Sequence, residues 1–239
     1  MGRYKLFMFF LAISLKAPRA LSTSLCDADG WSPVWAEDFH GDTLNTSKWQ
    51  RTLGQNAGQL RDALGTENNV YVEGGALVLR SQRQQATGPG GIQFNFTSGA
   101  VTTMGKASWD GVEPTRVCVS AKLPGGAAVA IPGAADGIWP GHWMMPEDTS
   151  CWPEHGEIDI MEMINGDGVS HGTYHWRRGT PKVNFPALNT GRTNCIPALN
   201  TAIGGKITVA GGDWPTAWHE YATEYGPDGG GYVRFFVDG

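Results

Sequence analysis

The sequence predicts an all-β protein, a sandwich or barrel built from many short strands. Short runs of β-branched and aromatic residues alternate with turns rich in Gly and Pro, and helical periodicity is nearly absent. Ten Trp and 41% apolar residues supply enough hydrophobic side chain for a packed core, which excludes a disordered chain. Neither an internal repeat nor a linker composition interrupts the 239 residues, so a single domain is the simplest organisation.

Five segments carry the clearest strand patterns, and in chain order they are 70–72, 76–79, 116–121, 156–163 and 232–237. The first two are separated by Gly74-Gly75, a dipeptide typical of a tight hairpin turn. The last is followed by Asp238-Gly239, a second hairpin dipeptide. A hairpin turn requires a returning strand, so we expect a fold whose C-terminal strands are missing from these residues.

The first residues have the pattern of a secretory signal. A basic start and the ten-residue apolar run 6–15 precede Ala20 and Ser22, which occupy the −3 and −1 positions of a cleavage site. The run is too short to span a membrane. We therefore expect residues 1–22 to be removed on export, leaving residues 23–239 as a secreted domain without a membrane anchor.

The charge balance of the chain is acidic. The whole sequence has 18 basic and 23 acidic residues, a net charge of −5. All charged residues of the predicted signal are basic, so the mature chain would have 14 basic and 23 acidic residues, a net charge of −9. Such a chain lacks the basic excess that neutralises phosphates, which argues against a nucleic-acid partner.

The four cysteines predict disulfide bonds. An even number of cysteines in an exported chain favours two disulfides, for which three pairings are possible. Their wide spacing contains no C-x-x-C signature, so a zinc site is not expected. The four are Cys26, Cys118, Cys151 and Cys195.

The chemistry of the chain concentrates in residues 156–162, with the sequence GEIDIME. On a strand, Glu157 and Asp159 point to one face and the apolar residues between them to the other. A regular strand would place Glu162 on the wrong face. One extra residue, a β-bulge around Ile160-Met161, would return Glu162 to the face of the other two acids.

These acids have no basic neighbours in sequence. From Leu123 to Trp176 the chain has eight acidic residues and no Lys or Arg. Clustered carboxylates repel one another, which raises the pKa of at least one and can keep it protonated near neutral pH. Glycoside hydrolysis needs two carboxyl groups of this kind, one that attacks the sugar and one that protonates the leaving oxygen.

Two other interpretations compete with a catalytic site. Three acids on a strand are often a solvated face, and carboxylates also bind Ca²⁺ or Mg²⁺. The surrounding aromatic residues favour a glycan, because apolar C–H faces of sugars stack on aromatic rings. The flanking residues are Trp139, Trp143, Trp152, Trp176, His142, His155, His171 and His175. The spacing of the acidic and aromatic residues alone does not decide between a carbohydrate site and the two other interpretations, a solvated strand face and a cation site.

The same residues resemble glycoside hydrolase family 16. The resemblance is carried by WPGHW at 139–143 and WPEHGEIDIME at 152–162. It continues in VWAEDF at 34–39, GTYH at 172–175 and FVDG at 236–239, so it covers nearly the whole mature chain. The resemblance implies a β-jelly-roll sandwich of the concanavalin A-like lectin and glucanase type, whose concave sheet forms a glycan cleft.

The spacing E-x-D-x-x-E resembles that of laminarinases and related endo-β-1,3-glucanases. The resemblance implies that Glu157 is the nucleophile and Glu162 the general acid/base of a retaining reaction, with Asp159 between them. Sugar subsites are expected at Trp139, Trp143, Trp152, His175 and Asn165.

No cofactor is implied by the resemblance, although parts of the family hold a structural Ca²⁺ whose ligands we cannot place here. The expected partner is a β-1,3-glucan or mixed β-1,3(4)-glucan, and the expected state a monomer. A β-glucan recognition protein, a transglycosylase and a galactan-active enzyme remain open as alternatives.

Overall fold

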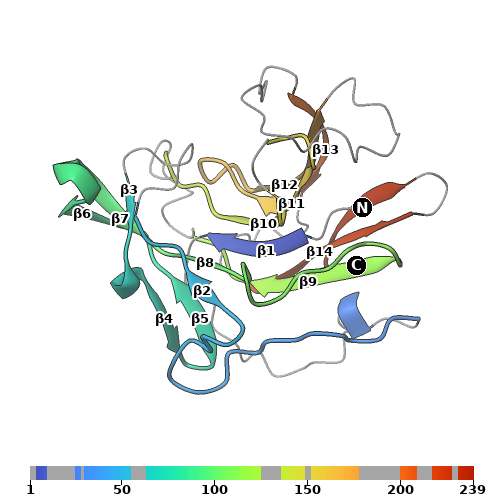
Figure 1. The fold of residues 1–239 in the computed structure, drawn as a ribbon, viewed down its shortest axis with the longest axis horizontal. Helices are drawn as coiled ribbons and strands as arrows, with labels where there is room; N and C mark the ends of the chain where they lie inside the picture. The colour runs from blue at the N-terminus through green and yellow to red at the C-terminus, as the bar shows by residue number, and fades with distance from the viewer. Residues whose placement is uncertain are drawn as a thin grey trace.

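The computed structural model of the chain arranges its strands mainly in two layers (Figure 1). The structure describes residues 4–9, 25–27, 30–54, 63–124, 136–148, 152–177, 200–208, 217–227 and 231–239. Within these ranges the chain is almost entirely strand and loop. The predicted all-β fold is therefore confirmed.

The larger layer is a seven-stranded sheet in the order β13-β12-β11-β10-β1-β8-β2, in which neighbouring strands are antiparallel. Because the chain order does not follow the spatial order, strands distant in sequence lie side by side. The strands are β1 Tyr4–Phe9, β2 Gln50–Arg51, β8 Ala100–Thr102, β10 Gly141–Pro146, β11 Glu157–Glu162, β12 Val169–Arg177 and β13 Asn200–Thr208.

The second layer is a three-stranded antiparallel sheet in the order β15-β14-β9. Its strands are β9 Thr115–Ala121, β14 His219–Gly226 and β15 Tyr232–Val237. β14 packs across from β11, and the main hydrophobic core lies between the two sheets. Apolar side chains from both layers are buried there: Met144, Ile158, Ile160, Met161, Val119 and Tyr221. This core explains why alternate residues on each strand are hydrophobic.

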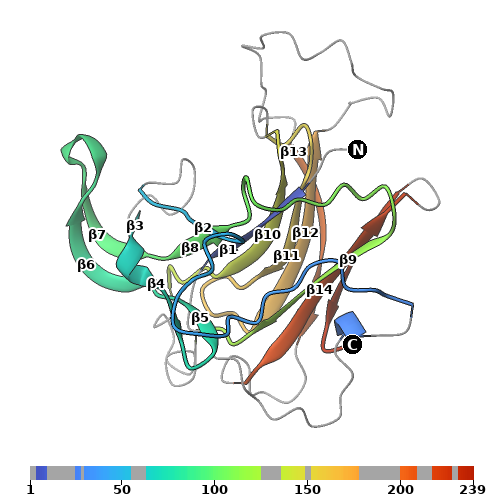
Figure 2. The same ribbon diagram turned by 60° about the horizontal axis from the view of Figure 1, so that its bottom comes forward.

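Smaller elements flank the sandwich. The curved hairpin of β6 and β7 projects from the body together with β3 (Figures 1 and 2). These elements are β3 Ala63–Gly65, β4 Val70–Glu73, β5 Ala76–Leu79, β6 Gln82–Thr87, β7 Gln93–Ser98, and the 3-10 turns η1 Leu25–Asp27, η2 Glu67–Asn69 and η3 Pro89–Gly91. The helices in the described part of the chain are these short turns, and none has the length or apolar character needed to cross a membrane.

The strands predicted from sequence match the structure closely. β5 and β15 have the predicted bounds, β4 and β9 differ from them by one residue at one end, and β11 is one residue shorter at each end. Gly74 and Gly75 both have positive φ, 60° and 78°, as the predicted hairpin turn between β4 and β5 requires. Asp238 and Gly239 also have positive φ.

One strand comes from an unexpected segment. Residues 4–9, which lie within the predicted export signal, form β1 between β10 and β8. β1 pairs with six residues of β10 and with three residues of β8. Removal of residues 1–22 would therefore leave the facing edges of these two strands without the hydrogen bonds that β1 supplies. Cleavage of the signal stays a prediction.

A disulfide joins Cys26 of η1 to Cys118 of β9, with the two Cα atoms 6.0 Å apart. It fastens a segment between β1 and β2 to β9 of the second layer. This bond confirms one of the two predicted disulfides. Cys151 and Cys195 lie outside the described residues, as does most of the predicted loop 124–137.

His142 of β10 is a polar residue in the middle of the core. It is fully buried against the ring of Tyr221, with the ring centroids 6.1 Å apart. Neither of its ring nitrogens has a hydrogen-bond partner among the described residues. Burial lowers the pKa of His142 from 6.5 to about 3, because the charged imidazole cannot be solvated there.

We expect replacement of His142 by Leu to stabilise the protein and to flatten its stability against pH. The unfolded chain takes up a proton near pH 6.5, whereas folded His142 does so only near pH 3, so stability falls as the pH decreases through this window. Between pH 7 and pH 5 the native chain should lose about 2 kcal/mol more than the variant. Urea unfolding at several pH values measures this difference.

His40→Gln is the matched control, because His40 is exposed and its loss should leave the pH dependence unchanged. Parallel stability curves for the native chain and His142→Leu would show that His142 is not the buried titrating group.

Candidate active site

The three predicted carboxylates lie on β11, and the register of the sheet places them on one face. Across β12, Glu157 pairs with His175, Asp159 with Thr173 and Glu162 with His171. Ile160 and Met161 thus stand opposite one residue of β12, and the pairing with β10 shifts at the same place. This is the predicted β-bulge, which the structure confirms.

The consequence of the bulge is a row of acids above an apolar layer. His171, Thr173 and His175 alternate along β12 and so share one face, and their partners on β11 share it too. Ile158 and Ile160 are buried in the core beneath. The carboxylates therefore occupy the outer face of the seven-stranded sheet.

Glu157 is held by an indole. Its side chain is almost fully buried, and Trp152 Nε1 donates a hydrogen bond to its Oε2 atom. Burial first, and the charge of Asp159 second, raise the pKa of Glu157 to about 7. The hydrogen bond from Trp152 and the neighbouring His175 oppose this shift without cancelling it.

Glu162 has a closely similar environment at the other end of the row. Trp139 Nε1 donates to Glu162 Oε1 at 2.8 Å. Burial and then the charge of Asp159 raise the pKa of Glu162 to about 7, while the Trp139 hydrogen bond and His175 lower it. Each glutamate thus has one indole N–H donor and the same acidic neighbour.

Asp159 lies between the two glutamates and is 3% exposed. Its Oδ2 atom is 3.2 Å from His175 Nε2, and the His175 ring lies 5.8 Å from that of Trp152. His175 therefore links the central carboxylate to the indole that holds Glu157.

The electrostatics differ in one respect from the sequence-based expectation that repulsion among the carboxylates raises the pKa of at least one of them. The largest cause of the raised pKa is burial, with repulsion second, and it acts on Glu157 as strongly as on Glu162. Two carboxyl groups with pKa near 7 can hold one proton between them at neutral pH, which provides one acid and one nucleophile or base.

The predicted subsite residues do not all lie at the carboxylate face. Trp143 of β10 pairs with Asp159 and so shares its face, while Trp139 and Trp152 contact the glutamates directly. Asn165 instead accepts a hydrogen bond from the backbone N–H of Gly137 at 2.8 Å. Its side chain supports the loop that carries Trp139, and contact with a sugar stays a prediction.

Two further side chains lie at this face: His171, which the sequence indicated only as a flanking residue, and Thr173, which it did not single out. His171, opposite Glu162, has its Nε2 atom 2.6 Å from Asp167 Oδ2, and Thr173 stands opposite Asp159. The alternate spacing of His171, Thr173 and His175 is the signal that places them together, since a strand directs every second residue to one face.

No group of three or more His, Cys, Asp and Glu side chains arranged to hold a metal occurs in the described ranges. The carboxylate row contacts indoles and an imidazole, which do not supply the oxygen ligands that Ca²⁺ or Mg²⁺ prefers.

Comparison with known proteins relates the whole chain to enzymes that act on glycans. The family described as "XgeA-like, catalytic GH16 domain" matches residues 126–235. The chain is 29% identical to the beta-glucanase of Rhodothermus marinus over 243 residues, which covers 96% of this chain and 71% of that protein. It is 27% identical to glucan endo-1,3-beta-glucosidase A1 of Niallia circulans, covering 88% of this chain and 29% of that protein.

Solved structures agree with this relation. The endo-1,3-beta-glucanase of Streptomyces sioyaensis matches with a TM-score of 0.65 and 27% identity, over 89% of this chain and 74% of that one. The fold is accordingly a β-jelly roll. The carboxylate row on β11 lies within the matched residues 126–235, and along most of its length the chain is similar to glycoside hydrolase family 16 and to enzymes described as beta-glucanases.

Proposed function

We propose that the protein is a retaining endo-glycosidase that cleaves β-1,3-glucan or mixed β-1,3(4)-glucan at the face of β11. The observation that carries the proposal is the bulge at Ile160-Met161, which brings Glu157 and Glu162 to one face with Asp159 between them. The relatives from R. marinus and N. circulans, a beta-glucanase and a glucan endo-1,3-beta-glucosidase, support the choice of substrate.

In the first step, Glu157 attacks the anomeric carbon as a carboxylate while Glu162 donates its proton to the glycosidic oxygen. The bond from the anomeric carbon to that oxygen breaks, and the sugar remains bound to Glu157 as an ester. In the second step, Glu162 removes a proton from water, which attacks the same carbon and releases Glu157. Two inversions give net retention.

Neighbouring residues prepare this pair of steps. The Trp152 N–H stabilises the negative charge of Glu157 before attack and after release. Asp159, held by His175, keeps the pKa of both glutamates raised, so that a proton is available near pH 7. Trp143 and the exposed Trp139 offer aromatic faces beside the reacting sugar.

A glucan recognition protein without catalysis is the main alternative. It would not require two glutamates with raised pKa, and removing these carboxylates from water costs stability. The presence of all three carboxylates therefore favours the enzyme.

We expect Glu157→Gln to lower laminarin hydrolysis by about 10³-fold or more, because no nucleophile remains. Asp167→Asn is the matched control and should retain activity within a few-fold, since Asp167 contacts His171 rather than the glutamates. Reducing-end release measures both variants. Near-native activity of Glu157→Gln would contradict the proposed mechanism.

The two glutamates can be told apart with azide and an activated aryl β-glucoside of a laminari-oligosaccharide. Azide in place of the missing nucleophile in Glu157→Ala should give the α-glycosyl azide, by one inversion. In Glu162→Ala the glycosyl enzyme still forms, so azide should give the β-glycosyl azide. Proton NMR of the products assigns the configurations, and the opposite pattern would exchange the two roles.

Asp159→Asn should shift the pH–activity profile towards acid. Loss of the Asp159 charge removes a repulsion that raises the pKa of both Glu157 and Glu162, so each would ionise at lower pH. The optimum should move down by about half to one pH unit. The pH dependence of kcat/KM measures the shift, and an unmoved or more alkaline optimum would argue against this coupling.

The protein is proposed to act outside the cell after loss of residues 1–22. The basic start and the apolar run 6–15 support export. N-terminal sequencing of the exported protein identifies the cut. Because cleavage removes β1, residues 23–239 alone should melt at a lower temperature than residues 1–239. Equal melting temperatures would mean that β1 contributes no stability to the sheet.

A further inference from the structure

A second groove lies across the core from the carboxylates. It encloses about 460 Å³ between residues 31–39 and β9, within the range of roughly 300–1,000 Å³ typical of ligand sites. Val119 of β9 belongs to the core cluster that separates this groove from β11, and Val117 packs against that cluster. A molecule bound here would therefore not occupy the catalytic face.

We propose that this groove is a second, non-catalytic saccharide site that holds a neutral segment of the β-glucan on which the enzyme acts. The identity of the glucan rests on the proposed function. The character of the site rests on its own residues.

Two buried polar atoms in the groove lack hydrogen-bond partners among the described residues. They are Glu37 Oε2, on a side chain that is 9% exposed, and Nε1 of Trp49, which is 1% exposed. One is an acceptor and the other a donor. A sugar hydroxyl can both donate and accept, so a polyol can satisfy both atoms, whereas an ion of either sign can satisfy only one.

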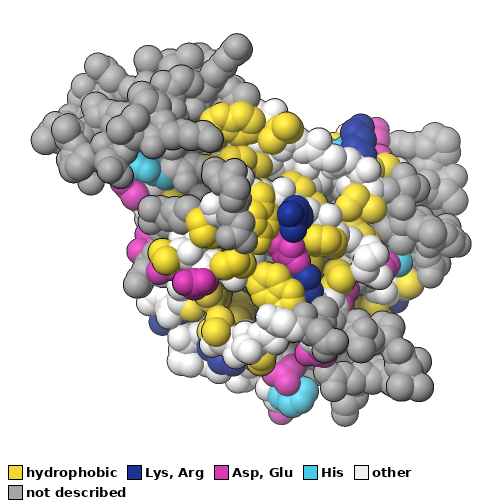
Figure 3. Space-filling model, turned by 90° about the vertical axis from the view of Figure 1, so that its right-hand side faces the viewer, with side chains coloured by type: hydrophobic (Ala, Val, Ile, Leu, Met, Phe, Trp, Pro, Cys, Tyr) yellow, Lys and Arg dark blue, Asp and Glu magenta, His cyan; other side chains and the backbone are white. Residues whose placement is uncertain are grey.

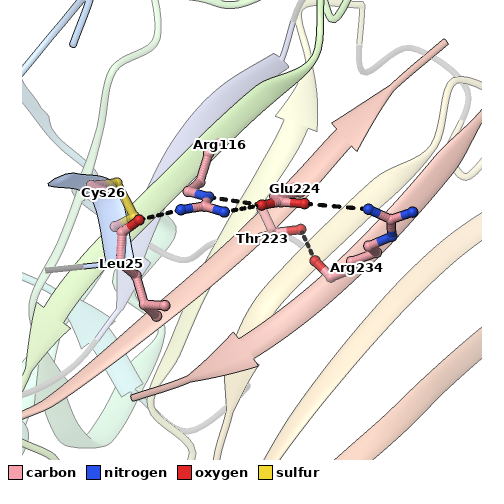
Figure 4. Close-up of polar contacts among 7 residues, drawn as sticks. Leu25, Cys26, Arg116, Thr223, Glu224 and Arg234 are labelled. Carbon is pink, nitrogen blue, oxygen red and sulfur yellow. Dashed lines mark hydrogen bonds and ion pairs between the residues drawn. A yellow bond between two sulfur atoms is a disulfide. The ribbon is translucent and has the colours of Figure 1, made fainter. Parts of the chain in front are cut away.

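The charges around the groove disfavour an anionic ligand. Arg116, the basic residue of β9 that lines it, is already committed to Glu224 and to the carbonyl of Leu25 (Figure 4). Glu224 also faces Arg234 at 3.7 Å. Figure 3 shows basic and acidic side chains in contact with one another among hydrophobic and other side chains.

A cation is already present beside Glu37. Lys48 Nζ is 3.6 Å from Glu37 Oε2 and lies over the Trp35 ring, 5.5 Å from its centroid. A second cation at the groove would be repelled by this ammonium group. The acidic residues Asp27, Glu113 and Glu220 also line the groove, so its charges disfavour an anion. Beside Glu37, where Lys48 already supplies the cation, the ligand that fits is a neutral one.

Aromatic rings complete the site. Trp31, Trp35 and Trp109 line the groove, and the Trp35 and Trp109 rings meet edge to face with centroids 5.5 Å apart. The disulfide at Cys26 and the packing of Trp31 on Arg116 hold this segment in place. Ring faces beside hydrogen-bonding atoms are the surface that a sugar, apolar on one face and polar at its edges, requires.

The test measures adsorption to insoluble β-1,3-glucan particles, in a Glu157→Gln background so that the particles are not consumed. We expect Trp31→Ala to weaken adsorption about tenfold, as loss of a central aromatic contact does at other interfaces. Glu37→Gln, which keeps the size of the side chain, should weaken it several-fold. Phe96→Ala on β7 is the control, because Phe96 is an exposed aromatic residue remote from the groove.

In the unsubstituted background, Trp31→Ala and Glu37→Gln should hydrolyse a short laminari-oligosaccharide with kcat/KM within twofold of the native value. Unchanged adsorption of both variants overturns the second site. A parallel loss of adsorption and oligosaccharide hydrolysis also overturns it, because the groove would then act through the fold. Absence of hydrolysis by the native protein would instead reject the proposed function and leave the adsorption comparison interpretable.

Discussion

The active face depends on one extra residue in β11. Without the bulge at Ile160 and Met161, strict alternation would direct Glu162 into the core and Met161 outwards. With it, both apolar side chains are buried, at 2% and 0% exposure, while Glu162 returns to the face of Glu157. The bulge is favourable because it buries two adjacent hydrophobic side chains in the core. The packing of the sandwich therefore also determines the face on which the acids lie. The glutamates are held in place by the sheet rather than by a loop, which fixes their spacing along the strand.

Burial, more than charge, then gives the glutamates their chemistry. The stretch from Leu123 to Trp176 lacks Lys and Arg, so no cation is available in sequence to hold the carboxylates ionised. Two indole N–H groups, from Trp139 and Trp152, provide hydrogen bonds without introducing positive charge. A basic residue in either place would lower the pKa of its glutamate far more than a neutral donor does, and would leave no group protonated at neutral pH. The tryptophans around this motif thus have an electrostatic role in addition to the sugar-stacking role proposed for them.

Sequence predicted the local features of this protein better than its long-range ones. Alternation and turn dipeptides located β5 and β15, and the spacing of Glu157, Asp159 and Glu162 predicted the bulge, because each depends on neighbouring residues. The place of β1 between β10 and β8 could not be foreseen, since strand order depends on which edges remain unpaired in the assembled sheet. For the same reason the pairing of Asn165 with Gly137 and the similar pKa shifts of the two glutamates became visible only in the assembled fold.

Buried polar atoms without partners have two meanings in this structure, and their surroundings separate them. His142 lies between the sheets against Tyr221, with a pKa lowered to about 3, and its environment offers no route for a ligand. The missing hydrogen bonds of the His142 ring therefore lower the stability of the fold. Glu37 and Trp49 lie instead where the chain folds over the edge of β9, and they line a groove large enough for a ligand. A molecule entering there can recover the hydrogen bonds that folding leaves unmade. A missing hydrogen bond therefore lowers stability at His142, whereas at Glu37 it can contribute to the affinity for the proposed ligand.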